Sequence, residues 1–413
     1  MRKIRISMLS IAFTLLGIMS IKAQEKKDVT DAFKPSMKIE GRIMYDFNFL
    51  SAGDDYSFAG NEFRRLRMAA KGTVTKNIGY KVEFDFAGGK VNYRDVYLKF
   101  ALPSNAGNVM LGSFTEPTSL NNMTSSKYIT FFERAMLANT QPFKYNAGVM
   151  YDNQKLLGGN LGLQLAYTFN GNKSEGFKDK DVDGGGNFIA RVTTALLKNK
   201  EKNQVVHLGV NYEHRDNDSD KYAYKLRTEN HMGNKQKVSA SGNFKNTSDI
   251  GFEAAATFGP LSVQSEYELS SIVTNVDTYK ANAYYAFVSY FITGEHRPYK
   301  NSSFGRVKPK ADFCLTDGTW GALELVARYS VMDLNDNIDL NGNDNKDYKI
   351  ANITAGFNWY LNKHTRIMYN FTSGNHGDLQ AETGKDALGN PIYGQIYGDD
   401  NLIGHLIRFQ IDF

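Results

Sequence analysis

Hydrophobic and polar residues alternate along most of the chain with the period of two that is typical of β-strands. Between Lys38 and Phe49, odd positions hold apolar residues or glycine, whereas even positions are mostly charged or polar. The same pattern recurs at 66–74, 80–86, 161–169, 206–212, 250–258, 323–331, 353–359, 367–371 and 405–413. With these, about sixteen such runs are present along the chain. They predict strands of roughly ten residues, the length that a tilted strand needs to cross a bilayer.

The connections between these runs alternate between short and long. Residues 75–78 and 362–363 are tight turns, whereas 170–187, 333–349 and 373–401 are long and polar. Periplasmic or secreted sandwiches and propellers also alternate, but their strands are shorter and their apolar face forms a core. Charges confined to one face of long, aromatic-ended strands favour a polar interior and an apolar exterior. The predicted fold is all-β: a transmembrane antiparallel β-barrel.

Both chain ends point to export into the outer membrane of a Gram-negative bacterium. Three cations, Arg2, Lys3 and Arg5, precede the apolar run 6–21, so we expect a signal peptide over 1–23. A periplasmic segment at 24–37 and the barrel at 38–413 should follow. The last residues, 405–413, form an alternating strand that ends on Phe413 and resembles the C-terminal signal of bacterial outer-membrane barrels. We expect this strand to pair with 38–49 so that no edge meets lipid.

Charge and composition give no support to nucleic-acid binding or to a metal site. Cleavage would remove four cations and no acids, lowering the formal charge from +5 to about +1. The single cysteine, Cys314, excludes an intrachain disulfide and a cysteine-based metal site, and the seven histidines are dispersed. Residues 179–184 and 337–343 copy fragments of a calcium loop, but the first has Ala190 where the terminal Glu belongs. We expect no cofactor.

Several stretches resemble the phosphate-selective porin O and P family. They are 63–67, 80–90, 94–100, 111–117, 124–134, 290–299 and 358–362. The resemblance implies a homotrimer of about sixteen-stranded barrels, inserted by the barrel-assembly machinery and surrounded by outer-membrane lipid. It also implies that each pore is narrowed by an infolded third loop, here about 116–142. That segment is unusually apolar, with Tyr128, Ile129, Phe131, Phe132, Met136 and Leu137. We therefore expect it to be packed rather than solvated.

The resemblance further implies an anion-binding constriction built from arginines of the first strands and hydroxyls of the third loop. The matching positions are Arg42, Arg64, Arg65, Asp95, Ser125, Ser126 and Arg134. Alternation adds Arg67 and places it in the lumen with Arg42 and Arg65. Arg64 should face outward unless it lies at a bend or beyond the apolar band. Guanidinium groups can replace the hydration shell of a phosphate or carboxylate with bidentate hydrogen bonds. Asp95 is expected to orient an arginine.

An alternative is that these arginines are ordinary lumen ion pairs of a general porin. Glu40, Asp46, Glu83 and Asp85 share the inward faces, and Asn122 stands where the family has a lysine. The family's mid-chain arginine ladder also has no counterpart, because Arg191, Arg215 and Arg227 are scattered.

The sequence predicts a channel for passive diffusion of small anions, with phosphate or polyphosphate as candidate solutes. The alternative is a general or organic-solute porin with little phosphate selectivity. An outer-membrane lipase or protease would need a Ser-His or acidic dyad near the lipid rim, and none stands out, so we expect no enzyme. An adhesin or receptor that uses the long loops remains open.

Overall fold

The computed structural model describes residues 33–54, 56–140, 145–169, 185–219, 223–233, 236–239, 242–334, 348–376, 380–385, 391–394 and 400–413. The expected signal peptide and both calcium-loop fragments lie outside these residues. Within the described ranges, no helix has the length and apolar character needed to cross a membrane.

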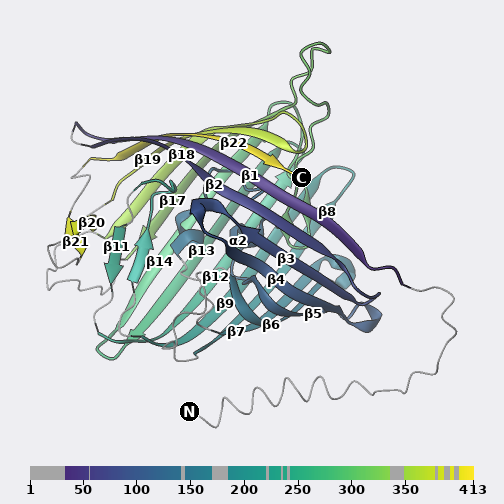
Figure 1. Ribbon diagram of the computed structural model, residues 1–413, viewed down its shortest axis with the longest axis horizontal. Helices are drawn as coiled ribbons and strands as arrows, with labels where there is room; N and C mark the ends of the chain where they lie inside the picture. Colours follow the sequence, from purple (N-terminus) through teal and green to yellow (C-terminus); the bar gives the residue numbers. More distant parts are fainter. Residues whose placement is uncertain are drawn as a thin grey trace, which may run out of the picture. The chain divides into compact units, whose positions relative to one another are not determined.

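Sixteen of the described strands form one closed antiparallel barrel, as the alternation predicted (Figure 1). In barrel order they are β1 (Ser36–Ala52), β2 (Tyr56–Thr73), β3 (Ile78–Asp85), β4 (Asn92–Ala101), β5 (Asn108–Thr115), β6 (Tyr145–Leu156), β7 (Leu161–Phe169), β8 (Gly186–Asn199), β9 (Gln204–Ser219), β12 (Phe244–Phe258), β13 (Leu261–Thr274), β14 (Thr278–Phe291), β17 (Ala322–Asp333), β18 (Lys349–Tyr360), β19 (Thr365–Gly374) and β22 (Leu402–Asp412).

The last strand closes the barrel against the first. β1 and β22 pair antiparallel from Arg42 opposite Asp412 to Ser51 opposite Ile403. Beyond this ladder, the N–H of Gly41 donates to the carbonyl of Phe413 at 3.0 Å, and the reverse bond measures 3.2 Å. The ring of Phe413 lies where a Cβ on Gly41 would stand, so a larger residue at position 41 would have to displace that ring. The predicted pairing of the chain ends is confirmed.

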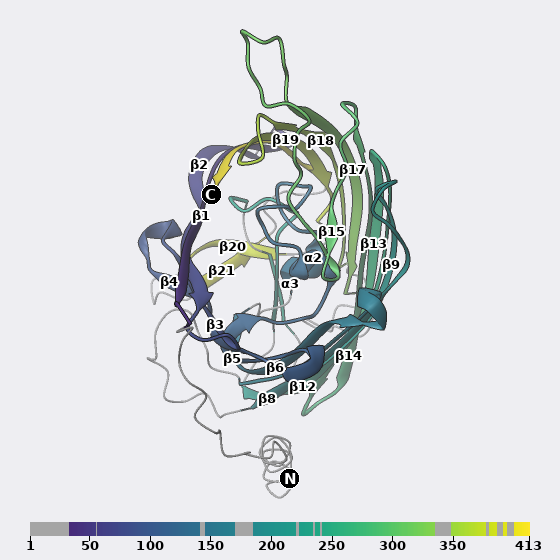
Figure 2. The same ribbon diagram turned by 90° about the vertical axis from the view of Figure 1, so that its right-hand side faces the viewer.

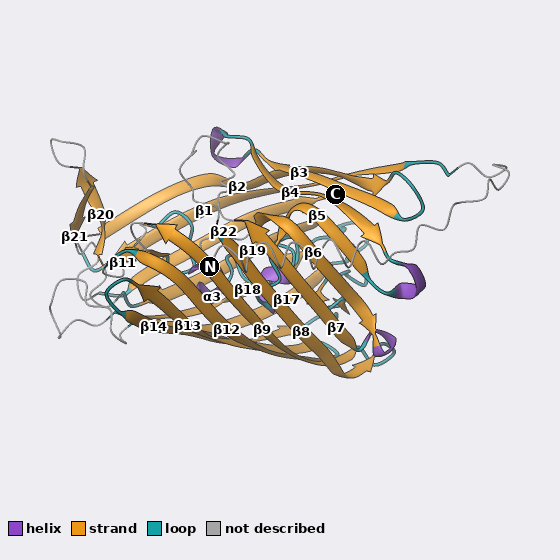
Figure 3. Cartoon of the chain, turned by 90° about the horizontal axis from the view of Figure 1, so that it is seen from below, coloured by secondary structure: helices purple, strands orange, loops and turns teal. Residues whose placement is uncertain are grey.

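Burial alternates along the strands as expected for a barrel with an apolar exterior. Leu165, Val192, Phe252, Leu269 and Phe409 are exposed, while their polar strand neighbours are buried. Seen from below, the strands run side by side at a tilt (Figure 3). An outward apolar face around a polar interior is the arrangement that suits lipid outside and water inside.

Connections at the two ends of the barrel differ. The start of β1 and the end of β22 share one end with short turns at 74–77, 102–107, 157–160, 200–203, 259–260 and 361–364. Two of these turns contain the short 3₁₀ turns 103–105 and 157–159. The exception at this end is residues 292–321, which contain β15 (Tyr299–Lys300) and β16 (Ser303–Phe304). The opposite end carries the long connections.

Three of those long connections contain secondary structure of their own. Residues 116–144 include α2 (Leu120–Met123) and α3 (Met136–Thr140). A four-stranded sheet joins two others, in the order β10 (Ala223–Leu226), β11 (Gln236–Ser239), β20 (Gln380–Lys385) and β21 (Pro391–Gly394). The shorter 86–91 connection holds a 3₁₀ turn at Ala87–Gly89.

A charge on the outward face should be costly. Leu269 lies near the middle of β13 and is 44% exposed. Leu269→Arg should lower the free energy of unfolding by about 2–4 kcal/mol in lipid vesicles, because it places a cation in the hydrocarbon. Urea unfolding measures this, with Leu269→Phe as the control. Equal stability of the two variants would contradict an outward Leu269.

Candidate functional site

The connection after β5 is packed, as its apolar composition predicted. Described residues 116–138 are mostly buried, and α2 and α3 are seen within the ring of strands (Figure 2). Phe131 packs with Tyr285, Phe287 and Val326 of the wall, and its ring is 5.2 Å from that of Phe287. Further residues of the segment contribute to three other apolar clusters: Phe132, Leu120, Met136 and Leu137.

Polar side chains of the last four barrel strands hold the backbone of this segment. Asn370 accepts from the N–H of Phe132 at 2.8 Å. The carbonyls of the segment accept five bonds from the wall: Lys127 from Gln410 (2.9 Å), Ile129 from Arg366 (2.9 Å), Thr130 from Asn358 (2.8 Å), Phe132 from Arg408 (2.5 Å) and Glu133 from Arg328 (3.0 Å). A buried segment without regular structure needs such partners, because unpaired buried backbone groups are costly. Sequence reasoning missed these residues, although Arg408 and Gln410 lie on the polar face of the last run.

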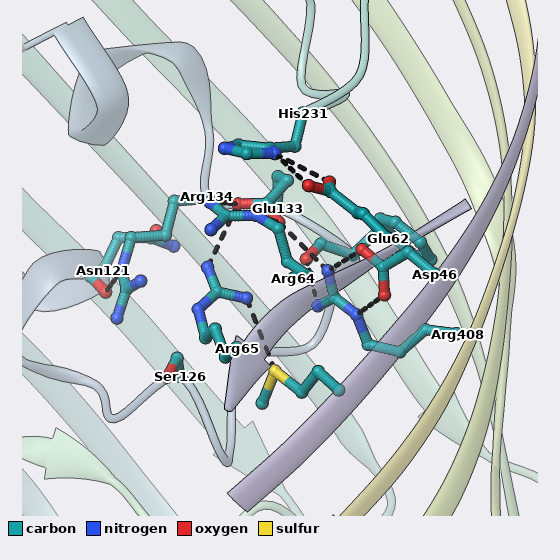
Figure 4. Close-up of polar contacts among 12 residues, drawn as sticks. Asp46, Glu62, Arg64, Arg65, Asn121, Ser126, Glu133, Arg134, His231 and Arg408 are labelled. Atoms are coloured by element: carbon teal, nitrogen blue, oxygen red, sulfur yellow. Dashed lines mark hydrogen bonds and ion pairs between the residues drawn. The ribbon is translucent and has the colours of Figure 1, made fainter. Parts of the chain in front are cut away.

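Glu133 of this segment is the centre of an ion-pair cluster (Figure 4). Its carboxylate accepts from Arg64 at 2.8 Å and 3.0 Å, from Arg65 at 3.2 Å and from Arg408 at 3.0 Å. Arg408 also donates to Asp46 through Nε and Nη2, each at 2.7 Å. Burial alone would raise the pKa of Glu133, but Arg64 and Arg65 hold it well below the ordinary value. The cluster therefore stays charged and anchors the segment.

A shift in strand register explains why both Arg64 and Arg65 face inward. Met44 lies opposite Arg65 and Tyr45 opposite Phe63, so Arg64 is an extra residue in β2. A bulge of this kind reverses the alternation and re-aims side chains. Regular alternation would direct Arg64 outward, but that expectation held only for a strand without a bend. The strand does bend at this point.

Arg42 and Arg67 both contact carboxylates of β3. Arg42 donates to Ser126 Oγ at 2.5 Å and lies 3.3 Å from Glu83. Arg67 donates to Asp85 at 2.8 Å and to Glu83 at 3.2 Å. These contacts are the lumen ion pairs of the alternative interpretation. Arg42 nevertheless retains one buried donor, Nε, without a hydrogen-bond partner among the described residues.

Asp95 pairs with a lysine, so the expected role of orienting an arginine is wrong. Its carboxylate accepts from Lys81 Nζ at 2.6 Å and from the N–H of Thr115 at 3.2 Å. A second register shift causes this arrangement: Val82 lies opposite Val96 and Phe84 opposite Tyr93, which leaves Arg94 and Asp95 together in β4. Arg94 takes Asp85 instead, at 3.1 Å.

The last two predicted positions lie close to α2. Arg134 is buried and donates to the carbonyls of Asn121 at 2.8 Å and Thr124 at 2.7 Å, which ties the two halves of the segment together. Ser125 Oγ accepts from the N–H of Lys127 at 3.4 Å.

One cavity of about 310 Å³ brings together five of the eight predicted residues: Arg42, Asp95, Ser125, Ser126 and Arg134. The other three, Arg64, Arg65 and Arg67, do not line it. Sequence reasoning missed further lining residues, among them Lys81, Lys99, Tyr97, Met110, Phe114 and Met150. Several of these lie on inward positions of strands that alternation had already identified.

Two further connections contact the inner wall. Glu229, between β10 and β11, accepts from Arg328 and, at 2.9 Å, from Asn352. In the 292–321 connection, the Ser302 carbonyl accepts from Arg191 Nη2 at 3.0 Å. Arg191 also pairs with Glu253 at 2.7 Å. Arg215 pairs with Glu116 at 2.6 Å, so Arg191 and Arg215 are both committed to carboxylates. Among described residues, no cluster of His, Cys, Asp and Glu could hold a metal ion.

Comparison with known proteins gives consistent matches. The family model described as phosphate-selective porin O and P matches residues 37–397. Porin O of Pseudomonas aeruginosa is 28% identical over 420 residues, covering 92% of this chain and 88% of that protein. An anion-selective porin from Comamonas acidovorans has a similar fold, with a TM-score of 0.56 at 16% identity, covering 92% of this chain and 100% of that one. The trimer form of OmpT from Vibrio cholerae has a TM-score of 0.55 at 15% identity, covering 91% and 99%.

Removing the central carboxylate should destabilise the packed segment. Glu133→Gln leaves Arg64, Arg65 and Arg408 without their shared anion, so the free energy of unfolding should fall by about 3–5 kcal/mol. Urea unfolding in vesicles measures the change. Glu201→Gln, in the exposed turn after β8, is the control and should have little effect. A similar small effect of Glu133→Gln would show that the cluster does not anchor the segment.

Proposed function

Because the chain belongs to the phosphate-selective porin O and P family, we propose that this outer-membrane porin passes small anions through the cavity that contains Arg42 and Arg134. The protein is a porin by family and by fold, and both point to a channel rather than an enzyme. Solutes therefore move down their own gradients. The further proposal concerns where the charge selection occurs and what supports it.

The observation that carries the proposal is the chemistry of the cavity lining. Arg42 and Arg134 face the same space as the Ser125 and Ser126 side chains, and Arg42 Nε is an unused buried donor. Guanidinium and hydroxyl donors suit a partly dehydrated oxyanion. The full lining holds four cations, Arg42, Lys81, Lys99 and Arg134, against three carboxylates, Glu83, Asp95 and Asp152. The excess of one positive charge favours anions but leaves binding weak enough for release.

The packed segment after β5 would narrow the passage. Its backbone is bound to β17, β18, β19 and β22, while its Ser126 side chain contacts Arg42 of β1. These contacts follow one continuous part of the wall, because β22 pairs with β1. A segment held in this way supports a fixed constriction rather than a mobile lid.

Phosphate is a plausible solute, but the lining supports anion preference more than a tight phosphate site. Asn122, a neutral amide, lines the cavity where the family resemblance implies a lysine. Arg191 and Arg215 are bound to Glu253 and Glu116 and cannot form a cationic track for phosphate. The second candidate, a general or organic-solute porin, is favoured by the carboxylates in the same lining.

We also propose a homotrimer, as in the trimer form of the similar OmpT. An apolar groove of about 540 Å³ crosses the outer surface at the start of β1 and across β3–β5, with Met37, Tyr80, Val82, Leu98 and Leu111 in its lining. Its position on the barrel exterior makes this wall a candidate subunit contact.

Charge changes in the cavity should change ion selectivity in opposite directions. Arg42→Gln should lower the anion-to-cation permeability ratio and Glu83→Gln should raise it, each by roughly twofold to tenfold for one unit charge near the passage. Reversal potentials in a salt gradient across planar bilayers give the ratio. Arg42→Lys keeps the charge and is the control. Cation preference of the unmodified protein would overturn the proposed function.

The trimer should depend on the apolar groove on the outer surface of β1 and β3–β5. Light scattering of the detergent-solubilised protein should give the mass of three chains, and Leu98→Asp should reduce it to one. Leu325→Asp, which exposes the same charge on β17, is the matched control and should leave the trimer intact. A monomeric unmodified protein would contradict the assembly.

A further inference from the structure

An apolar cluster lines the inner wall beside the cationic site. Met110 and Phe114 of β5, Met150 of β6, Ala166 of β7 and Ile189 of β8 pack together, with Tyr97 of β4 against them. All five clustered residues are buried. An aqueous barrel lumen is expected to be polar, so a contiguous apolar surface on the inner wall requires a reason.

Packing of the infolded connections accounts for the other inward apolar clusters among the described residues. Each of those contains a residue of the 116–140 segment or of 292–321: Met136, Phe132, Phe131, Val307 and Leu120, respectively. The cluster around Met110 contains none. Packing against an infolded connection therefore does not explain the apolar surface of this cluster.

This cluster instead borders the cavity. Met110, Phe114 and Met150 line it together with Tyr97, while Arg42 and Arg134 line the same space. The cavity thus has an apolar patch beside its cationic and hydroxyl donors, and the same lining holds the carboxylates Glu83, Asp95 and Asp152. A volume of about 310 Å³ is at the lower end of the range for small-molecule sites and suits one small solute.

We propose that the cavity prefers organic anions whose carboxylate or phosphate group carries a short aliphatic or aromatic arm. This inference rests on the proposed anion channel and specifies its solute class. The charged group contacts the guanidinium side, and the arm lies against Tyr97, Met110 and Met150. An inorganic anion has no apolar surface to place against these residues, whereas an organic arm removes its own apolar surface from water when it packs there.

Benzoate and acetate provide a direct test, because both are monoanions at pH 7 and differ in the arm. Full-length protein in planar bilayers carries a chloride current, and each added anion reduces that current as it occupies the cavity. Benzoate should half-block at a concentration roughly tenfold lower than acetate, as expected for burial of an aromatic ring edge. Equal half-block concentrations would overturn the inference.

Variants locate the preference. Met150→Gln replaces the apolar arm with a polar one of similar length, so it should raise the half-block concentration for benzoate roughly fivefold to tenfold and leave that for acetate unchanged. Met368→Gln is the matched control, because Met368 is a buried inward methionine of β19 outside the cavity lining. Equal loss in both variants, or no loss in Met150→Gln, would overturn the assignment to this wall.

The two proposals fail in distinguishable ways. If reversal potentials show anion preference but benzoate and acetate block equally, the channel function stands and the organic-arm inference falls. If the unmodified protein prefers cations, both fall. Should Met150→Gln not fold, the comparison of benzoate with acetate on the unmodified protein still decides the inference.

Discussion

Closure of the sheet is the constraint on which the rest of this structure depends. A strand edge cannot be left in hydrocarbon, because its N–H and C=O groups would have no partners there. Pairing of β22 with β1 removes that edge. The closed barrel separates lipid outside from water inside. Its outward side chains are therefore apolar, and nearly all of its charged side chains point inward. The site chemistry follows from this separation, because the lumen is where charged groups must find partners.

Inside the barrel, pairing among charges decides which groups remain for a solute. Most lumen arginines either bind carboxylates or hold the backbone of the segment after β5, as Arg408 does in both ways. The positively charged lumen is therefore largely a structural network. Arg42 and Arg134 differ in bordering a cavity while they also serve the packing. In the function we propose, anion preference comes from the excess of one positive charge at this cavity and not from the number of arginines.

Two register shifts change which charged side chains of β2 and β4 face the lumen. One extra residue in each of β2 and β4 lets two consecutive charged residues reach the lumen network: Arg64 with Arg65, and Arg94 with Asp95. Each bulge puts two adjacent charged residues near the same lumen network, which regular alternation cannot do. The cost is a disrupted ladder. The benefit is a denser set of ion pairs beside the cavity.

Periodicity predicted the barrel and its closure by the last strand, because a period of two and strand length are local properties of the chain. The packing of residues 116–142 was expected from their apolar composition and from the family resemblance. The family resemblance selected positions that the structure largely brings together around Arg42. The sequence could not show which arginines form ion pairs, because partners such as Glu133 and Arg408 are 275 residues apart in the chain. The partner of Asp95 and the apolar wall at Met110 were likewise decided by register shifts and by contacts between distant strands. Those depend on strand register and on contacts between distant parts of the chain, which no local pattern encodes.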